Sequence, residues 1–548
     1  EPAAGLTGLV KILLALEHET IPPTLHLDRP NDHIRFEDTP FYVVDRPVPW
    51  PRTGTPRRAA VSAFGMGGVN AHVIVEEPPP LPPREPLPQH SHVIRVSGAT
   101  EDAVRELAGS YARHLTGHPD TPVGDVAYTA NAGRASHRHR IAVAGADAAE
   151  LTRELTAVAG GDRPIGRLAN QPPTVAFLFT GQGSQYPDMG RELYEAEPVF
   201  RAALDECADL LTPHTDQPLL PLLYGGGRES LTQTRFAQVG IVAVQVALVR
   251  LLESWGIRPG VVLGHSVGEL TAGWAAGCLG LPELMRLTAL RGRVMQAQPA
   301  DGAMAVVHAD ADTVLAALGA HPGVEVAAFN GPRNVTVSGP VHAVEAFRSA
   351  VGHATQRLTV SHAFHSAAMD GAVAPFAEAV AAETLAAPRV PFASTFTGGW
   401  HTPGTVADPH AWARALRAPV RFSQALATVH AGGARVYWEI GPQPTLVTLG
   451  RTVLPQDDLH WLHTLRRNTS DQRQLHTALT TFYNHGHGDV RWEAVHAGKG
   501  HRTTGIPTYP FDRQLLVAPP VTEPAHPADG VAGHPLFDRH YEHQGEGT

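Results

Sequence analysis

Cysteine is nearly absent from this 548-residue sequence. The two that occur, Cys207 and Cys278, lie far apart and have no metal-ligand spacing. This scarcity excludes a disulfide-stapled scaffold and favours a reducing compartment, so we interpret both thiols as core residues. An excess of basic residues is also missing, because the formal net charge is -10 and no lysine- or arginine-rich run stands out. We therefore expect no nucleic-acid partner.

Long apolar runs are missing as well. The longest, residues 240–252, is interrupted by Gln245 and Arg250 and is too short to cross a bilayer. The first residues lack the charged and then apolar layout of a signal peptide. We therefore expect a soluble, cytoplasmic protein without a membrane partner.

Metal-binding patterns are absent from a sequence that is otherwise rich in histidine. The 32 histidines are scattered, and none forms a His-x-x-x-His pattern with a supporting carboxylate. We interpret most of them as solvated surface residues and predict no metal site.

What the sequence does have is length, and stretches rich in proline and glycine that divide it into segments. Its 548 residues suggest about three or four domains. The proline-rich stretch 78–88 cannot form a helix or a central strand, so it is expected to be an extended connector. A second stretch rich in proline, glycine and small residues runs from 518 to 533. Together with the pattern of apolar residues, these breaks predict segments at 1–77, 78–173, 174–463, 464–517 and 518–548.

The apolar pattern predicts an α/β fold. Residues 92–97, 100–115 and 140–143 are typical of a strand, a helix capped by Thr100 and a second strand, which form a small α/β unit. From 174 to about 462 strands and helices alternate, which predicts a parallel sheet with helices on both faces, similar to an α/β-hydrolase core. Inside it, residues 303–362 follow the order βαββαβ of an inserted ferredoxin-like subdomain.

The most informative motif is Gly264-His265-Ser266-Val267-Gly268. It lies between an apolar run and a stretch of small residues suited to a helix, which is typical of a nucleophile elbow rather than a simple turn around a buried serine. A nucleophilic Ser266 needs a base, and we select His365 over His362. The backbone N–H of Val267 and the glycine-rich turn at Gln182 are the candidate oxyanion donors.

Four motifs occur in one order with consistent spacing: residues 179–185 (FTGQGSQ), the elbow, residues 291–296 (RGRVMQ) and residues 362–366 (HAFHS). Together they resemble the acyltransferase domain of a modular type I polyketide synthase, which is related to malonyl-CoA:acyl-carrier-protein transacylases. The resemblance covers about residues 174–462 and implies the acyltransferase domain at 174–463.

The flanks resemble other parts of such a synthase. Residues 1–77, with Lys11, resemble the C-terminal end of a ketosynthase, and about 91–170 resemble the linker domain between ketosynthase and acyltransferase. Residues 507–511 resemble the post-acyltransferase linker, and 534–537 the opening of a dehydratase domain. The chain is thus expected to be a piece of a megasynthase. Its ketosynthase remnant lacks the catalytic cysteine and histidines, so we expect no condensation activity and a segment that packs poorly or is disordered.

The resemblance implies a mechanism. Ser266 attacks an acyl-CoA thioester, His365 accepts its proton, and Val267 with Gln182 stabilises the oxyanion. The phosphopantetheine thiol of an acyl carrier protein then takes the acyl group, so the chain itself binds no cofactor. The expected partners are malonyl-CoA or a related acyl-CoA, the carrier protein and other domains of the synthase. No acid of a triad is visible, and the family orients this histidine through backbone carbonyls, so we expect a Ser-His dyad.

The same resemblance assigns substrate-binding residues. Arg291 is expected to hold the malonyl carboxylate through a bidentate contact. His362 and Phe364 belong to the version of the motif typical of malonyl domains, and a phenylalanine at 364 fills the space of an α-methyl group. Gln238 matches a pocket glutamine, although Val239-Gly240 after it depart from the usual Pro-Ala, and His265 completes the set.

Three alternatives stay open on the sequence alone. The same reaction could use methylmalonyl or a rarer extender unit. A serine hydrolase would share the elbow but leaves Arg291 and the flanks unexplained. A structural or docking segment with a vestigial site would leave Ser266 without an acyl group.

Overall fold

The computed structural model describes residues 3–80, 83, 87–226 and 229–512. It divides into two compact units, residues 1–85 and 86–548, and each is described by itself. The predicted dehydratase-like start within 518–548, and residues 513–517 of the segment before it, lie outside the described residues.

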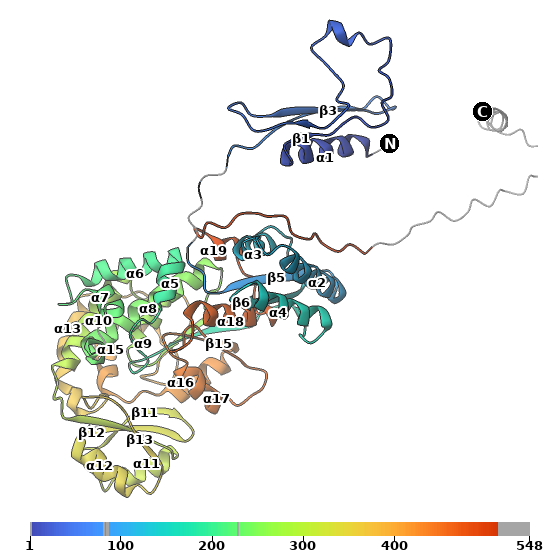
Figure 1. Ribbon diagram of the computed structural model, residues 1–548. Coiled ribbons are helices and arrows are strands. Elements are labelled where there is room, and N and C mark those ends of the chain that lie inside the picture. Colours follow the sequence, from blue (N-terminus) through green and yellow to red (C-terminus); the bar gives the residue numbers. More distant parts are fainter. Residues whose placement is uncertain (1–2, 81–82, 84–86, 227–228, 513–548) are drawn as a thin grey trace, which may run out of the picture. The chain divides into compact units, whose positions relative to one another are not determined.

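The first unit is a helix on a hairpin (Figure 1). Helix α1 (Ala4–Glu17) lies against β3 (Arg58–Phe64), which pairs antiparallel with β4 (Asn70–Glu76), and a short pair joins β1 (Thr20–Ile21) to β2 (Val48–Pro49). The contact is close, because a Cβ on Gly8 would come within 2.7 Å of Val61. Large apolar side chains such as Leu6 and Ile74 are nonetheless exposed. So small a unit cannot bury all of its apolar surface.

The second unit is built on a five-stranded parallel sheet. Its order is β14-β9-β8-β15-β16, and every neighbouring pair is parallel. The strands are β8 (Thr174–Phe179), β9 (Val261–Gly264), β14 (Phe392–Ala393), β15 (Ala434–Ile440) and β16 (His460–His463). The predicted parallel core is confirmed.

Helices cover both faces of this sheet. Successive residues of β8 alternate between two cores, with Phe177 and Phe179 in one and Ala176 and Leu178 in the other, because side chains of a strand point to opposite faces. The first core packs against α6 (Pro198–Leu211), α8 (Thr234–Ser254) and α10 (Leu281–Gln296), the second against α16 (Phe422–Ala431) and α17 (Thr445–Val453). The remaining helices of this region are α5 (Arg191–Ala196), α7 (Leu219–Tyr224), α9 (Gly268–Ala275), α13 (Asp370–Ala381), α14 (Pro403–Ala407) and α15 (Pro409–Arg417).

One helix has the length and apolar composition of a membrane span. It is α8, of whose apolar window 89% is buried inside the fold. Core helices of soluble proteins pass the same test, and its apolar side chains pack in the first core.

The predicted ferredoxin-like subdomain is confirmed. Its elements are β10 (Gly302–Val307), α11 (Ala311–Leu318), β11 (Glu325–Gly331), β12 (Asn334–Pro340), α12 (Val341–Ala350) and β13 (Thr355–Arg357). The strands form an antiparallel sheet in the order β11-β12-β10-β13 and bury a core of their own. An isolated parallel bridge between Ala328 and Val420 joins this sheet to the segment before α16.

The small α/β unit before the core is a three-stranded antiparallel sheet with helices. It contains β5 (His92–Gly98), β6 (His139–Gly145), β7 (Gly166–Arg167), α2 (Glu101–Gly117), α3 (Val123–Ala132) and α4 (Ala148–Gly160). Thr100 caps α2, as predicted, by accepting a hydrogen bond from the Ala103 N–H.

The end of the described chain ties this unit to the parallel-sheet core (Figure 1). Helix α18 (Asp471–Asn484) packs on β6. The side chain of its last residue, Asn484, exchanges two hydrogen bonds with the Ala142 backbone at 2.6 and 2.9 Å. After α19 (Trp492–His496), Ile506 enters the core of the small unit. Between them, Lys499 and Glu197 form a buried ion pair at 2.5 Å, with side chains 2% and 3% exposed.

Lys499→Ala is expected to destabilise the protein strongly. It leaves the Glu197 carboxylate buried without its partner, which costs about 3 to 5 kcal/mol in comparable sites. The thermal midpoint, followed by circular dichroism, should fall. The double variant Glu197→Gln/Lys499→Met, which removes both charges, should recover part of the loss. An unchanged midpoint in Lys499→Ala would contradict the stabilising role of this pair.

Candidate active site

Ser266 lies at the turn between β9 and α9, at the carboxyl end of the parallel sheet. Its φ of +54° is in the left-handed region, which a non-glycine residue adopts only under strain. The turn is possible because its glycines lack side chains. A Cβ on Gly264 would come within 2.2 Å of Gly268, and one on Gly268 within 2.3 Å of the Phe179 carbonyl oxygen. The backbone therefore holds the serine out from the sheet, as a nucleophile elbow does.

His365 faces this serine. Its Nε2 lies 2.8 Å from the Ser266 hydroxyl oxygen, and its Nδ1 lies 2.9 Å from the Ala418 carbonyl oxygen. A carbonyl only accepts, so Nδ1 carries the hydrogen and Nε2 is left as the acceptor for the serine hydroxyl. The histidine itself has a φ of +57°, so both members of the pair sit in left-handed backbone.

Burial lowers the pKa of His365 to about 3, and the positive charge of Arg291 and the nearby His265 add to the shift. The hydrogen bond to the Ala418 carbonyl opposes it. The imidazole is therefore neutral at physiological pH, which is the form that accepts a proton.

Arg291, on α10, brings a buried positive charge to the serine. One Nη donates to the Ser266 hydroxyl at 3.2 Å, and the other donates to Gln238 Oε1 at 2.6 Å. Burial lowers the pKa of the guanidinium to about 10, so it stays charged at neutral pH. Among the described residues no carboxylate lies within ion-pair distance of it. The site thus holds a cation whose counter-charge is open to a ligand.

Gln238 belongs to a chain of side chains that positions Arg291. It donates to Thr234 Oγ1 at 3.1 Å, and the Thr234 hydroxyl donates to Gln182 Oε1 at 2.5 Å. Gln238 is fully buried, whereas Gln182 faces the site. The chain therefore connects the glycine-rich turn after β8 to the guanidinium.

A cavity of about 590 Å³ opens above these groups. It lies between the carboxyl end of the parallel sheet and the ferredoxin-like subdomain, which contributes Met304 and Asn330 among others. Of the predicted site residues, the following line it: Gln182, His265, Ser266, Arg291, Phe364 and His365. A much smaller pocket of about 20 Å³ reaches Ser266 and Arg291 from the side of Trp412.

The two candidate oxyanion donors are backbone groups. In the described part of the chain, the N–H groups of Val267 and Gln182 have no recorded hydrogen-bond partner, although their neighbours in the turns do. Val267 precedes helix α9, whose N-terminal dipole favours negative charge. Both groups are available to an oxyanion beside Ser266.

His362 and His265 differ in their relation to the cavity. His362 is fully buried, does not line the cavity, and stacks on Phe364 with ring centroids 5.7 Å apart. Its nitrogens face the Gln296 carbonyl and the Ser361 hydroxyl. It therefore supports Phe364 from behind rather than touching the cavity. His265 does line the cavity, and Asn330 holds its Nε2 at 3.0 Å.

Several residues of the site carried no assignment at the level of sequence. Thr234 lies in the motif that contains Gln238 but had no role, and Asn330 and the Ala418 carbonyl belong to distant segments. Glu269 accepts hydrogen bonds from Ser394 and Thr395 and lies 2.9 Å from His401. Thr234 and Glu269 had a signal, since the first lies beside Gln238 in its motif and the second directly follows the elbow.

Three known protein families match parts of this sequence. The family described as "Acyl transferase domain" matches residues 176–488, more than half of the chain. Residues 1–28 match "Beta-ketoacyl synthase, C-terminal domain", and residues 30–143 match "Ketoacyl-synthetase C-terminal extension". The match at 30–143 extends across the boundary between the two units, which lies after residue 85.

Individual relatives agree with the family. The spectinabilin polyketide synthase system protein NorB of Streptomyces orinoci is 37% identical over 571 aligned residues, which cover 100% of this chain and 26% of that protein, so the chain spans about a quarter of its length. The solved acyl transferase domain of ZmaA superposes with a TM-score of 0.70 and 28% identity, covering 77% of this chain and 99% of that one. The acyl transferase domain of SpnD, in complex with 2-(pent-4-yn-1-yl)malonyl, gives 0.64 and 31%, covering 74% and 97%. With the fold and the family match, they show that this chain belongs to the acyl transferase domain family and is an acyltransferase of the modular type I polyketide synthase kind.

Proposed function

We propose that this acyltransferase takes a malonyl group from CoA, holds it as an ester on Ser266 and passes it to the phosphopantetheine thiol of an acyl carrier protein. The observation that carries the proposal is the meeting of two groups, an imidazole and a guanidinium, at one serine hydroxyl. The Ser266 oxygen has the His365 nitrogen at 2.8 Å and the Arg291 guanidinium at 3.2 Å, inside a cavity.

In the first half-reaction the Ser266 oxygen attacks the thioester carbon while its proton moves to His365 Nε2. The carbonyl oxygen becomes an oxyanion, for which the N–H groups of Val267 and Gln182 are the donors. When the tetrahedral intermediate collapses, the carbon–sulfur bond breaks and the sulfur leaves with the proton from His365. The Ala418 carbonyl, 2.9 Å from Nδ1, keeps the ring oriented throughout.

The second half-reaction runs the same steps with a different nucleophile. The carrier's thiol gives its proton to His365 and attacks the acyl-serine ester, and the proton then returns to the Ser266 oxygen. The low pKa of His365 supports this role, because a buried imidazolium gives up its proton readily. No acidic third member is needed, since a backbone carbonyl fixes the tautomer.

The first experiment is to incubate the protein separately with malonyl-CoA, methylmalonyl-CoA and acetyl-CoA and to read its intact mass. A malonyl adduct is expected on the wild type and none on Ser266→Ala, because only the serine oxygen can form the ester. Absence of an adduct from every donor would favour a vestigial site. CoA release much faster than transfer to a carrier protein would instead favour a hydrolase.

Arg291 supports a malonyl-type donor. Its guanidinium is buried and charged, and a carboxylate is the natural partner of such a fork. The SpnD domain, a relative whose structure contains a substituted malonyl group, is consistent with this class.

Arg291→Ala should lower kcat/KM for malonyl-CoA, because the carboxylate loses its charged partner in a desolvated site. The loss should correspond to about 2 to 5 kcal/mol of transition-state stabilisation. Acetyl-CoA, which has no carboxylate, should lose far less. The matched control is Arg293→Ala, since this arginine lies on the same helix but is exposed. Equal losses for both donors would contradict carboxylate recognition.

Phe364 supports the unsubstituted extender. Its ring is buried, lines the cavity and is held by the stacked His362 behind it. A side chain fixed in this way cannot move aside for an α-methyl group. Substitution by a smaller residue opens that space.

Phe364→Ser should therefore shift the preference toward methylmalonyl-CoA. One methyl group in an apolar pocket is worth about 1 to 3 kcal/mol of binding free energy. The ratio of the two kcat/KM values should change by the factor that corresponds to this energy. Phe347→Leu, in the subdomain core away from the cavity, controls for loosened packing. An unchanged ratio in Phe364→Ser would remove this residue from the specificity determinants.

A further inference from the structure

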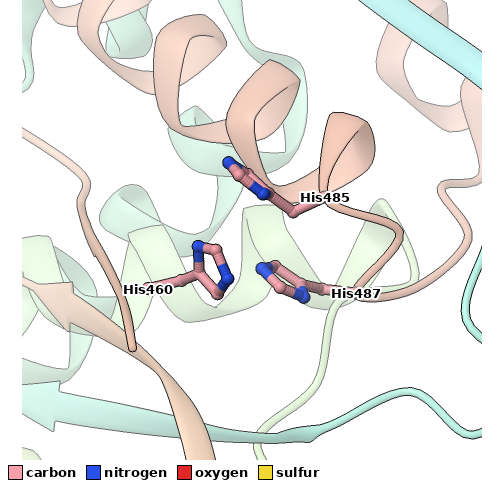
Figure 2. Close-up of side chains that lie close together, drawn as sticks. All are labelled: His460, His485 and His487. Carbon is pink, nitrogen blue, oxygen red and sulfur yellow. The ribbon is translucent and has the colours of Figure 1, made fainter. Parts of the chain in front are cut away.

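Three histidines lie together at an edge of the parallel sheet, away from the catalytic cavity. His460 begins β16, His485 caps the end of α18 directly after its last residue, and His487 follows two residues later (Figure 2). The ring centroid of His460 is 4.2 Å from that of His485 and 4.3 Å from that of His487. One nitrogen from each ring lies within 4.8 Å of the others. Figure 2 shows the three side chains around a common space.

Within the described part of the chain, the ring nitrogens of these histidines take part in no recorded protein hydrogen bond. His487 is only 6% exposed, and its Nε2 is buried without a partner. A buried polar nitrogen left unpaired is costly, so this nitrogen is a candidate for binding a ligand.

The backbone around the histidines is fixed. The N–H groups of His485 and Gly486 donate to carbonyls of the last turn of α18 at 3.1 and 3.0 Å. Gly486 has a φ of +69°, and a Cβ there would come within 2.1 Å of the Arg167 carbonyl oxygen. The loop thus holds His487 rigidly, while the exposed ring of His485 and the half-buried ring of His460 are free to rotate.

We propose that His460, His485 and His487 bind one divalent ion of the zinc class, with water as the fourth ligand. Tetrahedral zinc with bonds of about 2.0 to 2.1 Å separates its ligand nitrogens by about 3.3 Å. Rotation of the two mobile rings closes the nitrogens to that spacing. An all-imidazole set, without thiolate or carboxylate, suits Zn²⁺, Cu²⁺ or Ni²⁺ and not Mg²⁺ or Ca²⁺.

The ion would act as a structural clip. His460 belongs to the edge strand of the catalytic core, whereas the loop with His485 and His487 is continuous with groups that hold the small α/β unit. Asn484 pairs with the Ala142 backbone, and the Gly488 carbonyl accepts a hydrogen bond from Arg140 at 3.1 Å. The sequence predicted no metal site, since its only trace of this one is the pair His485-Gly486-His487.

Zinc titration of the full chain tests the site. The protein carries an affinity tag without histidine, is stripped with EDTA, and competes at pH 7.5 with a zinc indicator. The wild type should bind one equivalent that His485→Ala binds at least tenfold more weakly, because two imidazoles remain. His353→Ala, which removes an exposed histidine of the ferredoxin-like subdomain, should bind like the wild type.

Three further readouts decide the outcome. Zn²⁺ should raise the thermal midpoint of the wild type and not that of His485→Ala, and Co²⁺ should give the visible spectrum of a tetrahedral site only in the wild type. Acylation of Ser266 should persist in His485→Ala and after EDTA, which shows that the variant is folded and separates the ion from catalysis. Equal zinc affinity in the wild type and His485→Ala, or equal weakening in both variants, would mean scattered surface binding and would overturn the proposal.

Discussion

The site depends on how closely three backbone segments approach one another at the carboxyl end of the sheet. Gly268, at the start of α9, lies so near the Phe179 carbonyl that no side chain fits between them, and Gly264 is as close to Gly268. This contact seats α9 on the strand ends and forces Ser266 into left-handed backbone. The Ser266 hydroxyl, the Val267 N–H and the positive end of the α9 dipole then lie close together, because the close backbone contacts fix the path of the turn.

A second constraint is electrostatic. The cavity contains a buried guanidinium beside a neutral imidazole, and the charge of Arg291 helps to hold the pKa of His365 down. An acyl group that carries a carboxylate offsets this charge. A malonyl donor would therefore weaken one of the influences that make His365 a poor base, which an acetyl donor could not do. Under the proposed function, one arginine would link the selection of the donor to proton transfer.

Much of this arrangement could be predicted from the sequence, and the exceptions have physical reasons. The parallel core and the βαββαβ subdomain are evident because short apolar strands alternate with amphipathic helices over a long stretch. His362 and His365 are three residues apart in an irregular segment, so only the fold decides that one faces Ser266 and the other stacks behind Phe364. The Ala418 carbonyl leaves no trace in sequence, because any residue could supply it. Contacts between distant segments, such as β16 with the loop after α18, are likewise set by topology.

The segment that ends the described part of the chain also bears on when the molecule can complete its fold. Ile506 completes the core of the small α/β unit, and its carbonyl accepts a hydrogen bond from Arg134, 372 residues earlier in the sequence. At a synthesis rate of about 5 to 20 residues per second, this unit waits roughly 20 to 75 seconds on the ribosome before its final apolar side chain is made. Any folding of the small unit before that point would proceed without Ile506, so its core could be completed only after the strands of the catalytic core had been synthesised.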